Sequence, residues 1–340
     1  MFSNSILYLK NDLTGQVFDT KAKIIKLETA DNLSFHVSPN LDKADWSIES
    51  SCSLQKMYRQ RAQQIRNTYD YVVLYFSGGS DSITALNAFV KNNIHIDEVV
   101  VYTNEDTDDI KINGSYAIKY LQSIGYKGFV NNLNLNFQIL HKIVEQETWK
   151  SYESFSGQLS SVYRWRLDFF EDHRYFGKTI RTGNVAHVFS GMFPTIAKLE
   201  RKYYSVMTIN KIMHSDANPN NVQFFTSEDA PEVHIKQSHI ITKVIKRLEL
   251  KHKNPNYETE REYKLAVRDE YEPTISSAKN YGATNKEKMQ SDSQHNRLMK
   301  VYANKVEFIK QYDSVLEYFN SFNTIDFSQF NKKYFLFLEQ

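Results

Sequence analysis

The sequence is poor in the residues that build covalent or metal-held frameworks: it has one cysteine, Cys52, in 340 residues. A single cysteine excludes a disulfide framework within the chain, and it excludes any zinc or iron–sulfur site that needs several thiolates. The charges nearly cancel, with 42 Lys and Arg against 40 Asp and Glu. Such a balance provides no one-signed field to attract nucleic acid. No apolar run approaches the ~20 residues that a membrane-spanning helix needs.

The first ten residues also lack the charged start and the long apolar core of a signal peptide. We therefore expect a soluble, cytoplasmic protein without a membrane partner. Hydrophobic residues make up 41% of the chain, including 22 Tyr and 22 Phe, which is enough for a sizeable and aromatic core. The length suits one large domain or two of ordinary size.

The most informative segment is a short polar loop between a strand pattern and a helix pattern. Residues 71–76 are a continuous apolar and aromatic run of strand length. After the loop, Ile83, Leu86 and Val90 recur at helical spacing. The loop itself is Ser77-Gly78-Gly79-Ser80-Asp81-Ser82. A strand, a Ser/Gly turn and a helix in this order direct backbone N–H groups and a helix N-terminus at one point, which predicts an anion site.

The residue types of this loop fit a metal-bound phosphate better than a bare turn. Its two glycines let the backbone approach a ligand or take positive φ, and its three serines add hydroxyl donors. Asp81 would repel phosphate unless Mg²⁺ lay between the two groups. The simpler interpretation is a turn in which Ser80 caps a helix. That interpretation explains one serine and one glycine of the six residues.

The pattern S-G-G-x-D-S after a hydrophobic strand resembles the PP-loop of the N-type ATP pyrophosphatases. It is not a Walker loop, because the spacing G-x-x-x-x-G-K-[ST] and its lysine are absent. In the resembled family the loop grips the β- and γ-phosphates of ATP, which leave together as pyrophosphate while the substrate is adenylated. The resemblance implies ATP and Mg²⁺ as cofactors. The single cysteine argues against the sulfur-transferring members of that family.

The resemblance also implies roles for individual residues. Asp81 is expected to hold Mg²⁺, and strand-end residues are expected to frame adenine, largely through backbone groups. The expected pyrophosphate cradle is Ser77, Gly78, Gly79, Ser80 and Ser82. The expected adenine frame is Tyr75, Phe76, Tyr102 and Thr103.

Strand and helix patterns alternate around this loop, which predicts an α/β fold with a parallel sheet and right-handed crossovers. The resemblance specifies it as a PP-loop ATP pyrophosphatase (HUP-like) domain over residues 51–200. A small N-terminal β segment is predicted for residues 1–50, and a mainly helical substrate or accessory region for 201–340. The predicted strands are 6–9, 23–27, 33–37, 71–76, 98–103, 127–131 and 178–181, and the predicted helices are 53–67, 115–124, 137–149, 158–174 and 298–319.

A second segment, residues 182–193, resembles the asparagine synthetase motif S-G-D-G-G-D-E-L-F-G-G-Y. Thr182 and Gly183 occupy its first two positions, and the resemblance implies that they contact the nucleotide. The family's Asp-Glu pair is replaced by His187 and Val188. A protonated His187 could contact phosphate directly. It could equally be a histidine on a helix face with no role.

Further charged residues are weaker candidates. A cation is expected near the leaving pyrophosphate, and Lys178 and Arg181 are the first choices, with Lys198 next. Each of the three is more often simply a charged residue on the protein surface. Acids after the second sheet strand could bind metal, but a solvated loop with a helix N-cap role is favoured. A later acidic group could contact substrate, but a turn is favoured. The arginines before the loop could face phosphate, but a solvated face is favoured. These sets are Glu105, Asp106, Asp108 and Asp109; Glu228, Asp229 and Glu232; and Arg59, Arg61 and Arg66.

The leading hypothesis is an ATP-dependent, AMP-forming ligase that adenylates a small molecule and passes it to an amine. It would be asparagine synthetase-like, but without a glutaminase segment, because Phe2 stands where that segment opens on a cysteine. One alternative is a PP-loop enzyme that modifies a nucleotide or nucleic acid, supported by the basic stretch 236–253. Another is a non-catalytic ATP-binding protein, suggested by His187 and Val188. The substrate and the oligomeric state do not follow from the sequence.

Overall fold

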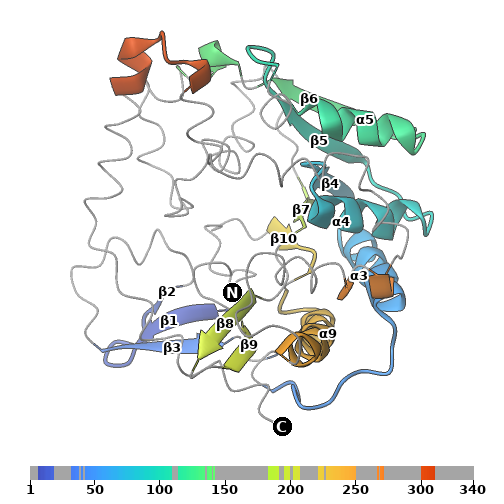
Figure 1. Ribbon diagram of the computed structural model, residues 1–340, viewed down its shortest axis with the longest axis vertical. Coiled ribbons are helices and arrows are strands. Elements are labelled where there is room, and N and C mark those ends of the chain that lie inside the picture. The colour runs from blue at the N-terminus through green and yellow to red at the C-terminus, as the bar shows by residue number, and fades with distance from the viewer. Residues whose placement is uncertain are drawn as a thin grey trace.

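The central element is a five-stranded, all-parallel sheet with strand order β10-β7-β4-β5-β6 (Figure 1). The computed structural model describes residues 7–18, 32–37, 40, 43–108, 114–134, 136–139, 141, 183–190, 195–199, 202–206, 221–225, 227–249, 266–267, 269–271 and 300–310. The strands of this sheet are β4 (Tyr71–Tyr75), β5 (Glu98–Thr103), β6 (Val130–Asn134), β7 (Val185–Phe189) and β10 (Asn221–Gln223).

The strand order places the first strand of the sheet, β4, at its centre. The chain continues outward through β5 and β6 on one side, and then returns to β7 and β10 on the other. The direction of the strand order therefore reverses between β4 and β7. In open parallel sheets, ligands bind outside the carboxyl ends of the strands at this reversal. The α/β fold with a parallel sheet is the fold that the sequence predicts.

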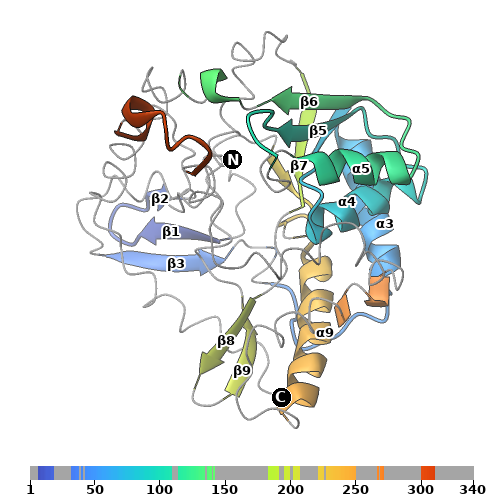
Figure 2. The same cartoon turned by 45° about the horizontal axis from the view of Figure 1, so that its top comes forward.

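Helices cover one face of this sheet. They are α3 (Leu54–Thr68), α4 (Ser80–Val90) and α5 (Ser115–Ser123), while α9 (Pro231–Glu249) lies beyond the edge of the sheet and packs against α3 (Figure 2). Alternate strand residues such as Leu74, Val101 and Val188 are buried under these helices in one large core. The predicted helices 53–67 and 115–124 are confirmed. Ser53 caps α3 by accepting from Lys56 N–H, and Gly125 follows α5 with φ +63°.

The opposite face of the sheet is less apolar. Tyr75 on β4 stacks on Phe189 of β7 at 4.4 Å between ring centroids, and Tyr102 of β5 stacks on the other side of Tyr75 at 6.5 Å. Tyr75 Oη also lies 3.0 Å from His187 Nδ1. The rings of Tyr75, Tyr102 and Phe189 thus lie at the carboxyl ends of three neighbouring strands.

A small antiparallel sheet, of order β2-β1-β3, precedes the parallel one. It consists of β1 (Leu7–Asn11), β2 (Val17–Phe18) and β3 (Leu33–Val37), and a turn at residues 12–15 joins the first two strands. The small N-terminal β segment is thus confirmed. The predicted strand 23–27 lies outside the described residues. Among the described residues, no helix is long and apolar enough to cross a membrane.

The described residues after 200 are mostly helical, but they also include strands that the sequence did not predict. A hairpin of β8 (Thr195–Leu199) and β9 (Lys202–Val206) spans the proposed boundary, and β10 joins the edge of the main sheet. The sequence did not predict β10, because three residues are too few to show the alternation of apolar and polar side chains that marks a strand. The predicted helix 298–319 is also interrupted: residues 302–304 form a turn, because the buried Tyr302 side chain is directed at the loop after β5.

One strand prediction needs correction, and another is not tested. The fourth strand was expected at 178–181, which lies outside the described residues, while residues 185–189 form β7. The segment that resembles the asparagine synthetase motif is therefore a strand over five of its residues, and His187 is not on a helix face. The predicted strand 127–131 begins three residues later, at Val130. Of the predicted helix 137–149, residues 137–139 and 141 are described as helical, and the helix 158–174 lies outside the described residues.

Candidate functional site

The Ser77–Ser82 loop leaves the carboxyl end of β4, beside the reversal in strand order. Its hydroxyls converge: Ser77 Oγ lies 3.1 Å from Ser82 Oγ and accepts from Gly79 N–H at 3.3 Å. Ser82 Oγ in turn donates to the Gly79 carbonyl at 2.9 Å. These bonds close the loop into a compact ring of hydroxyl and amide groups in front of α4.

Helix α4 begins without a side-chain cap. Gly79 is its N-cap residue, and Ser80 is already the first helical residue. The simpler interpretation, in which Ser80 caps the helix, therefore does not describe this turn. A helix N-terminus with a glycine cap presents its first amide groups and its positive dipole end to whatever lies in front of it. An anion is the ligand that such an end favours.

Gly78 is required by both its backbone conformation and its surroundings. Its φ is +68°, which side chains with a Cβ rarely adopt. A Cβ at this position would lie 2.6 Å from the Tyr116 ring and 2.9 Å from Ala117 Cα. The loop thus rests directly on the first turn of α5. A second positive-φ glycine, Gly114, precedes that helix, and a Cβ there would overlap the Tyr102 carbonyl oxygen.

The expected adenine frame is only partly available. The Phe76 side chain is fully buried in the helix-side core, and its N–H donates to Val100 O at 2.9 Å. Tyr75 and Tyr102 lie on the opposite face, in the stack described above. Thr103 Oγ1 donates to Asn132 Oδ1 at 2.7 Å. Each of the four residues stands at the carboxyl end of β4 or β5, which is where the sequence placed them.

The start of the second motif lies away from the loop. Gly183 precedes β7, and β7 runs parallel to β4 with Val185 opposite Tyr71. Gly183 is therefore at the amino edge of the sheet, a full strand length or about 15 Å from the loop. His187 and Val188 are mid-strand and face opposite sides, with Val188 fully buried in the core. Thr182, Lys178 and Arg181 lie outside the described residues, and the side chain of Lys198 is not among those described.

The acids after β5 bind protein groups. Asp106 Oδ2 accepts from the Phe137 N–H at 2.5 Å and from Tyr302 Oη at 2.8 Å. Glu105 and Asp108 are exposed, and Asp109 lies outside the described residues. Within the described part of the chain, no cluster of three or more His, Cys, Asp or Glu side chains could hold a metal ion.

Asp81 nevertheless fits the role of a magnesium ligand. It lies in the first turn of α4 and accepts a hydrogen bond from Ser80 Oγ at 3.1 Å. Mg²⁺ is commonly bound by one or two carboxylates together with substrate phosphates, so a single acid beside a phosphate loop is a sufficient protein contribution. The hydroxyl and amide donors of the loop fit the phosphate oxygens, and Asp81 fits the ion.

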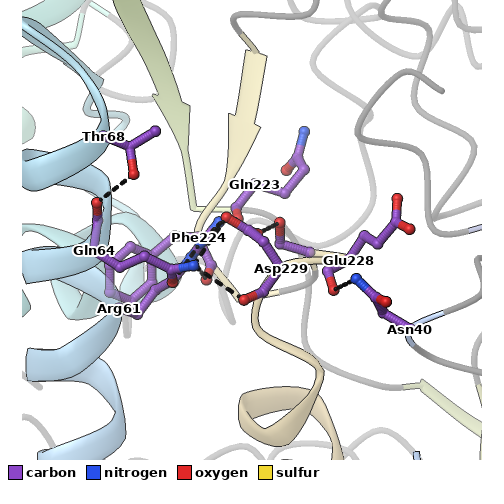
Figure 3. Close-up of polar contacts among 9 residues, drawn as sticks. Asn40, Arg61, Gln64, Thr68, Gln223, Phe224, Glu228 and Asp229 are labelled. Carbon is purple, nitrogen blue, oxygen red and sulfur yellow. Dashed lines mark hydrogen bonds and ion pairs between the residues drawn. The ribbon is translucent and has the colours of Figure 1, made fainter. Parts of the chain in front are cut away.

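A buried arginine forms a network that the sequence did not reveal (Figure 3). The Arg61 side chain is 1% exposed and pairs with Asp229 at 2.8 Å. It also donates to the carbonyl oxygens of Gln223 at 3.0 Å and Phe224 at 3.3 Å, where β10 ends. The expectation of a solvated face is thus wrong for Arg61, although Arg59 is exposed. Helical spacing is the signal that distinguishes the two, because Arg61 continues the apolar stripe of α3 one turn after Met57 and Tyr58, and Arg59 does not.

The two acids of the turn that follows β10 have opposite environments. Asp229 points toward Arg61, whereas the Glu228 side chain points away from it (Figure 3). Burial raises the pKa of Asp229, but the charge and hydrogen bond of Arg61 and the Ser227 hydroxyl lower that pKa overall. Burial and the adjacent charge of Asp229 raise the pKa of Glu228. The favoured prediction of a turn at this acidic group is confirmed.

The basic stretch on α9 is partly neutralised within the protein. Lys236 is buried and pairs with Glu49 at 2.8 Å and Glu270 at 3.3 Å. Lys243 pairs with the same Glu49 at 2.7 Å. Lys246 and Arg247, one turn later, are exposed. A continuous cationic face for nucleic acid is therefore not present along the described part of this helix.

Comparison with known proteins adds little to this geometry. No protein-family model matches the chain. No curated protein matches it either. Among solved structures, the chain is similar to the NH3-dependent NAD synthetase from Campylobacter jejuni in complex with the nitrate ion. The two share 13% sequence identity at a TM-score of 0.30, over 64% of this chain and 95% of the other. Similarity at that level supports no functional argument, so the strand order and the loop carry the assignment.

Proposed function

We propose that the protein is an ATP-dependent, AMP-forming ligase of the PP-loop type. One observation carries this proposal: the Ser77–Ser82 loop lies at the reversal in strand order, with a glycine-capped helix behind it and converging hydroxyls within it. Parallel sheets bind ligands at that place, and the donors present are those that bind phosphate.

The loop residues would bind and orient the β- and γ-phosphates. The amide of Gly79 and the hydroxyls of Ser77 and Ser82 lie within one compact ring and bond one another, so a polyanion would take these donors in place of the bonds within the loop. Donors fixed in advance stabilise the charge that develops on the leaving pyrophosphate. Mg²⁺ held by Asp81 would neutralise part of the same charge. A substrate oxygen would attack the α-phosphorus, and an amine would then displace AMP.

The asparagine synthetase-like part of the proposal rests on α3, β4 and the loop, since a helix that leads directly into the loop strand is a feature of that branch. The second motif lends no support, because residues 185–189 are β7. By the same geometry, the missing Asp-Glu pair is no argument for lost catalysis. His187 and Val188 are mid-strand and face opposite ways, so an acidic pair at these positions could not jointly serve the loop.

The nucleic-acid alternative is less favoured, because Lys236 and Lys243 of the basic stretch on α9 are paired with Glu49. A small molecule therefore remains the proposed substrate. Retention on heparin at moderate salt would reopen the alternative.

The proposal is tested by the product of ATP cleavage. Purified protein is incubated with α-labelled ATP, Mg²⁺ and a fractionated small-molecule extract, and AMP is separated from ADP. We expect AMP with wild type, none with Asp81→Ala, and unchanged AMP with Asp70→Ala, which removes an exposed acid at the amino edge. Formation of ADP would contradict the proposal. ATP binding without cleavage in any fraction would favour a non-catalytic role.

A further inference from the structure

The loop after β5 is tied to a segment almost two hundred residues later in the chain. Asn104 is fully buried, and its Oδ1 accepts from the Asp106 N–H at 2.9 Å. Its Nδ2 donates to Tyr302 Oη at 2.8 Å, and that hydroxyl donates to Asp106 Oδ2, also at 2.8 Å. A single tyrosine hydroxyl thus bonds both ends of a three-residue turn. Removing it leaves the amide of a buried asparagine without this acceptor.

The same contact joins three segments at the carboxyl edge of the sheet. Asp106 also accepts from Phe137 N–H, which begins the helical turn after β6. The rings of Phe137, Tyr302 and Phe308 pack within 5.4 to 5.7 Å of one another, measured between centroids. Figures 1 and 2 both show the 300–310 segment beside the 137–139 turn, beyond the ends of β5 and β6. The Tyr302 hydroxyl is the polar link inside this aromatic cluster.

Close packing connects this turn to the phosphate loop. The turn follows Thr103, and Gly114 lies against Tyr102 O and the Thr103 side chain. Gly114 is the N-cap of α5, whose first turn meets Gly78. Neither contact leaves room for a Cβ, so a displacement of the β5 end is passed on to the loop. Close-packed interiors transmit such shifts because they cannot absorb them.

We propose that Tyr302 is a positioning residue for the nucleotide site, which holds the Asn104–Asp106 turn in the shape that the Ser77–Ser82 loop needs to bind MgATP. The inference rests on the proposed function, and it makes the 300–310 segment part of the nucleotide-binding unit. It also predicts the reciprocal effect, because coupling between two sites acts equally in both directions: MgATP stabilises the 300–310 segment.

The test compares two tyrosine-to-phenylalanine variants by calorimetric titration with MgATP. Tyr302→Phe removes one oxygen and keeps the ring packing. Tyr58→Phe is the matched control: it also removes a fully buried hydroxyl, bonded to Gln237 Nε2 at 2.6 Å, but in the core under α3. We expect about a fivefold to tenfold rise in Kd for Tyr302→Phe, the size of a typical coupling effect, and a change below about twofold for Tyr58→Phe. Thermal midpoints should fall similarly in both variants.

A third variant separates the hydroxyl from the cluster. Phe308→Leu loosens the aromatic packing around Tyr302 but removes no hydroxyl, and we expect its Kd to rise less than that of Tyr302→Phe. Hydrogen exchange on wild type should show slower exchange over 300–310 when MgATP is added. Equal Kd values for Tyr302→Phe and wild type, or no protection of 300–310, would overturn the inference alone. Failure of wild type to bind MgATP would overturn the proposed function and this inference with it.

Discussion

The Ser77–Ser82 loop and the Arg61 network are two polar clusters at the same end of one sheet, and they use their donors differently. Every nitrogen of the Arg61 guanidinium meets an acceptor within the protein, from Gln64, Gln223, Phe224 or Asp229. The loop instead brings hydroxyls and a glycine-capped helix end together in front of α4. The Arg61 guanidinium bonds groups from a distant part of the chain and so holds the fold together, whereas the donors of the loop bond only their own loop and can turn to a ligand.

The two clusters also differ in burial. The Arg61 side chain is almost completely inaccessible, while Ser77 is exposed and Ser80 and Asp81 are half-buried. Changes in the Arg61 network should therefore affect stability, and changes in the loop should affect nucleotide binding. Each prediction below tests that division, from the largest expected effect to the smallest.

The largest effect is expected for Arg61→Met. The substitution keeps the aliphatic bulk but leaves two carbonyl oxygens without the Arg61 donors and Asp229 without its cation. Unsatisfied buried acceptors and a broken ion pair together should lower the free energy of unfolding by about 3 kcal/mol. Arg59→Met, on the exposed side of the same helix, should change it by less than about 0.5 kcal/mol. Urea unfolding measures both, and equal effects would show that the network does not stabilise the fold.

Gly78→Ala should affect both properties. The positive φ and the contacts with Tyr116 and Ala117 should lower the free energy of unfolding by about 2 kcal/mol. Gly15→Ala is the matched control, because Gly15 has nearly the same φ, +72°, but a Cβ there meets no atom within 4 Å. The control should lose about 1 kcal/mol or less.

Measuring MgATP affinity separates the Gly78→Ala and Gly15→Ala variants further. MgATP affinity should fall by about tenfold or more for Gly78→Ala, since the loop must shift to admit the methyl group. It should be unchanged for Gly15→Ala. A Gly78→Ala protein that is destabilised but binds MgATP normally would remove this loop from the nucleotide site.

The neighbouring acids Asp229 and Glu228 should show opposite pH dependences. The pKa of Asp229 is lowered in the folded protein, so its contribution is present above about pH 3.8, its unfolded value, and is lost as the pH falls through the lowered pKa. Asp229→Asn should therefore be less stable than wild type at neutral pH, and the gap should close in acid.

For Glu228 the sign is reversed. Its pKa is raised in the folded protein, so the ionised carboxylate disfavours folding above that pKa, and this penalty vanishes below about pH 4.5. Glu228→Gln should be slightly more stable than wild type at neutral pH, with the difference disappearing as the pH falls. Thermal unfolding from pH 3 to 8 measures both variants. A loss of stability in Glu228→Gln at neutral pH would contradict this assignment.

The smallest effect on stability is expected for Ser77→Ala. Ser77 is exposed and its hydroxyl bonds are local to the loop, so the free energy of unfolding should change by less than about 0.5 kcal/mol. MgATP affinity should nevertheless fall by about tenfold or more, as expected when one hydrogen bond to a charged group is lost. A variant that loses stability but not affinity would reverse the division between the two clusters.

The sequence predicted the loop because its signal is local. A strand run, six consecutive loop residues and a helical spacing are adjacent in the chain, so periodicity and residue type suffice to place β4, α4 and the turn between them. The parallel sheet followed from the alternation of strand and helix patterns. These features depend on neighbours within a few residues.

The parts that could not be predicted depend on distant partners. The acceptors that let Arg61 be buried on α3, Asp229 and the end of β10, come to it from more than 160 residues away. Residues 185–189 form a strand because β4 and β10 pair with them on both sides, although the segment resembles a loop motif. Tyr302 interrupts a helical pattern to reach Asn104. Tertiary contacts override local pattern at each of these positions.

The most direct test of the central claim is a crystal structure with Mg²⁺ and an ATP analogue that cannot be cleaved between the α- and β-phosphates. We predict that the β- and γ-phosphates lie within hydrogen-bonding distance of the Gly79 amide and the Ser77 and Ser82 hydroxyls, with Asp81 on the Mg²⁺ and the α-phosphate directed away from the loop. A nucleotide bound elsewhere, or one whose γ-phosphate points away from the Ser77–Ser82 loop, would contradict the account.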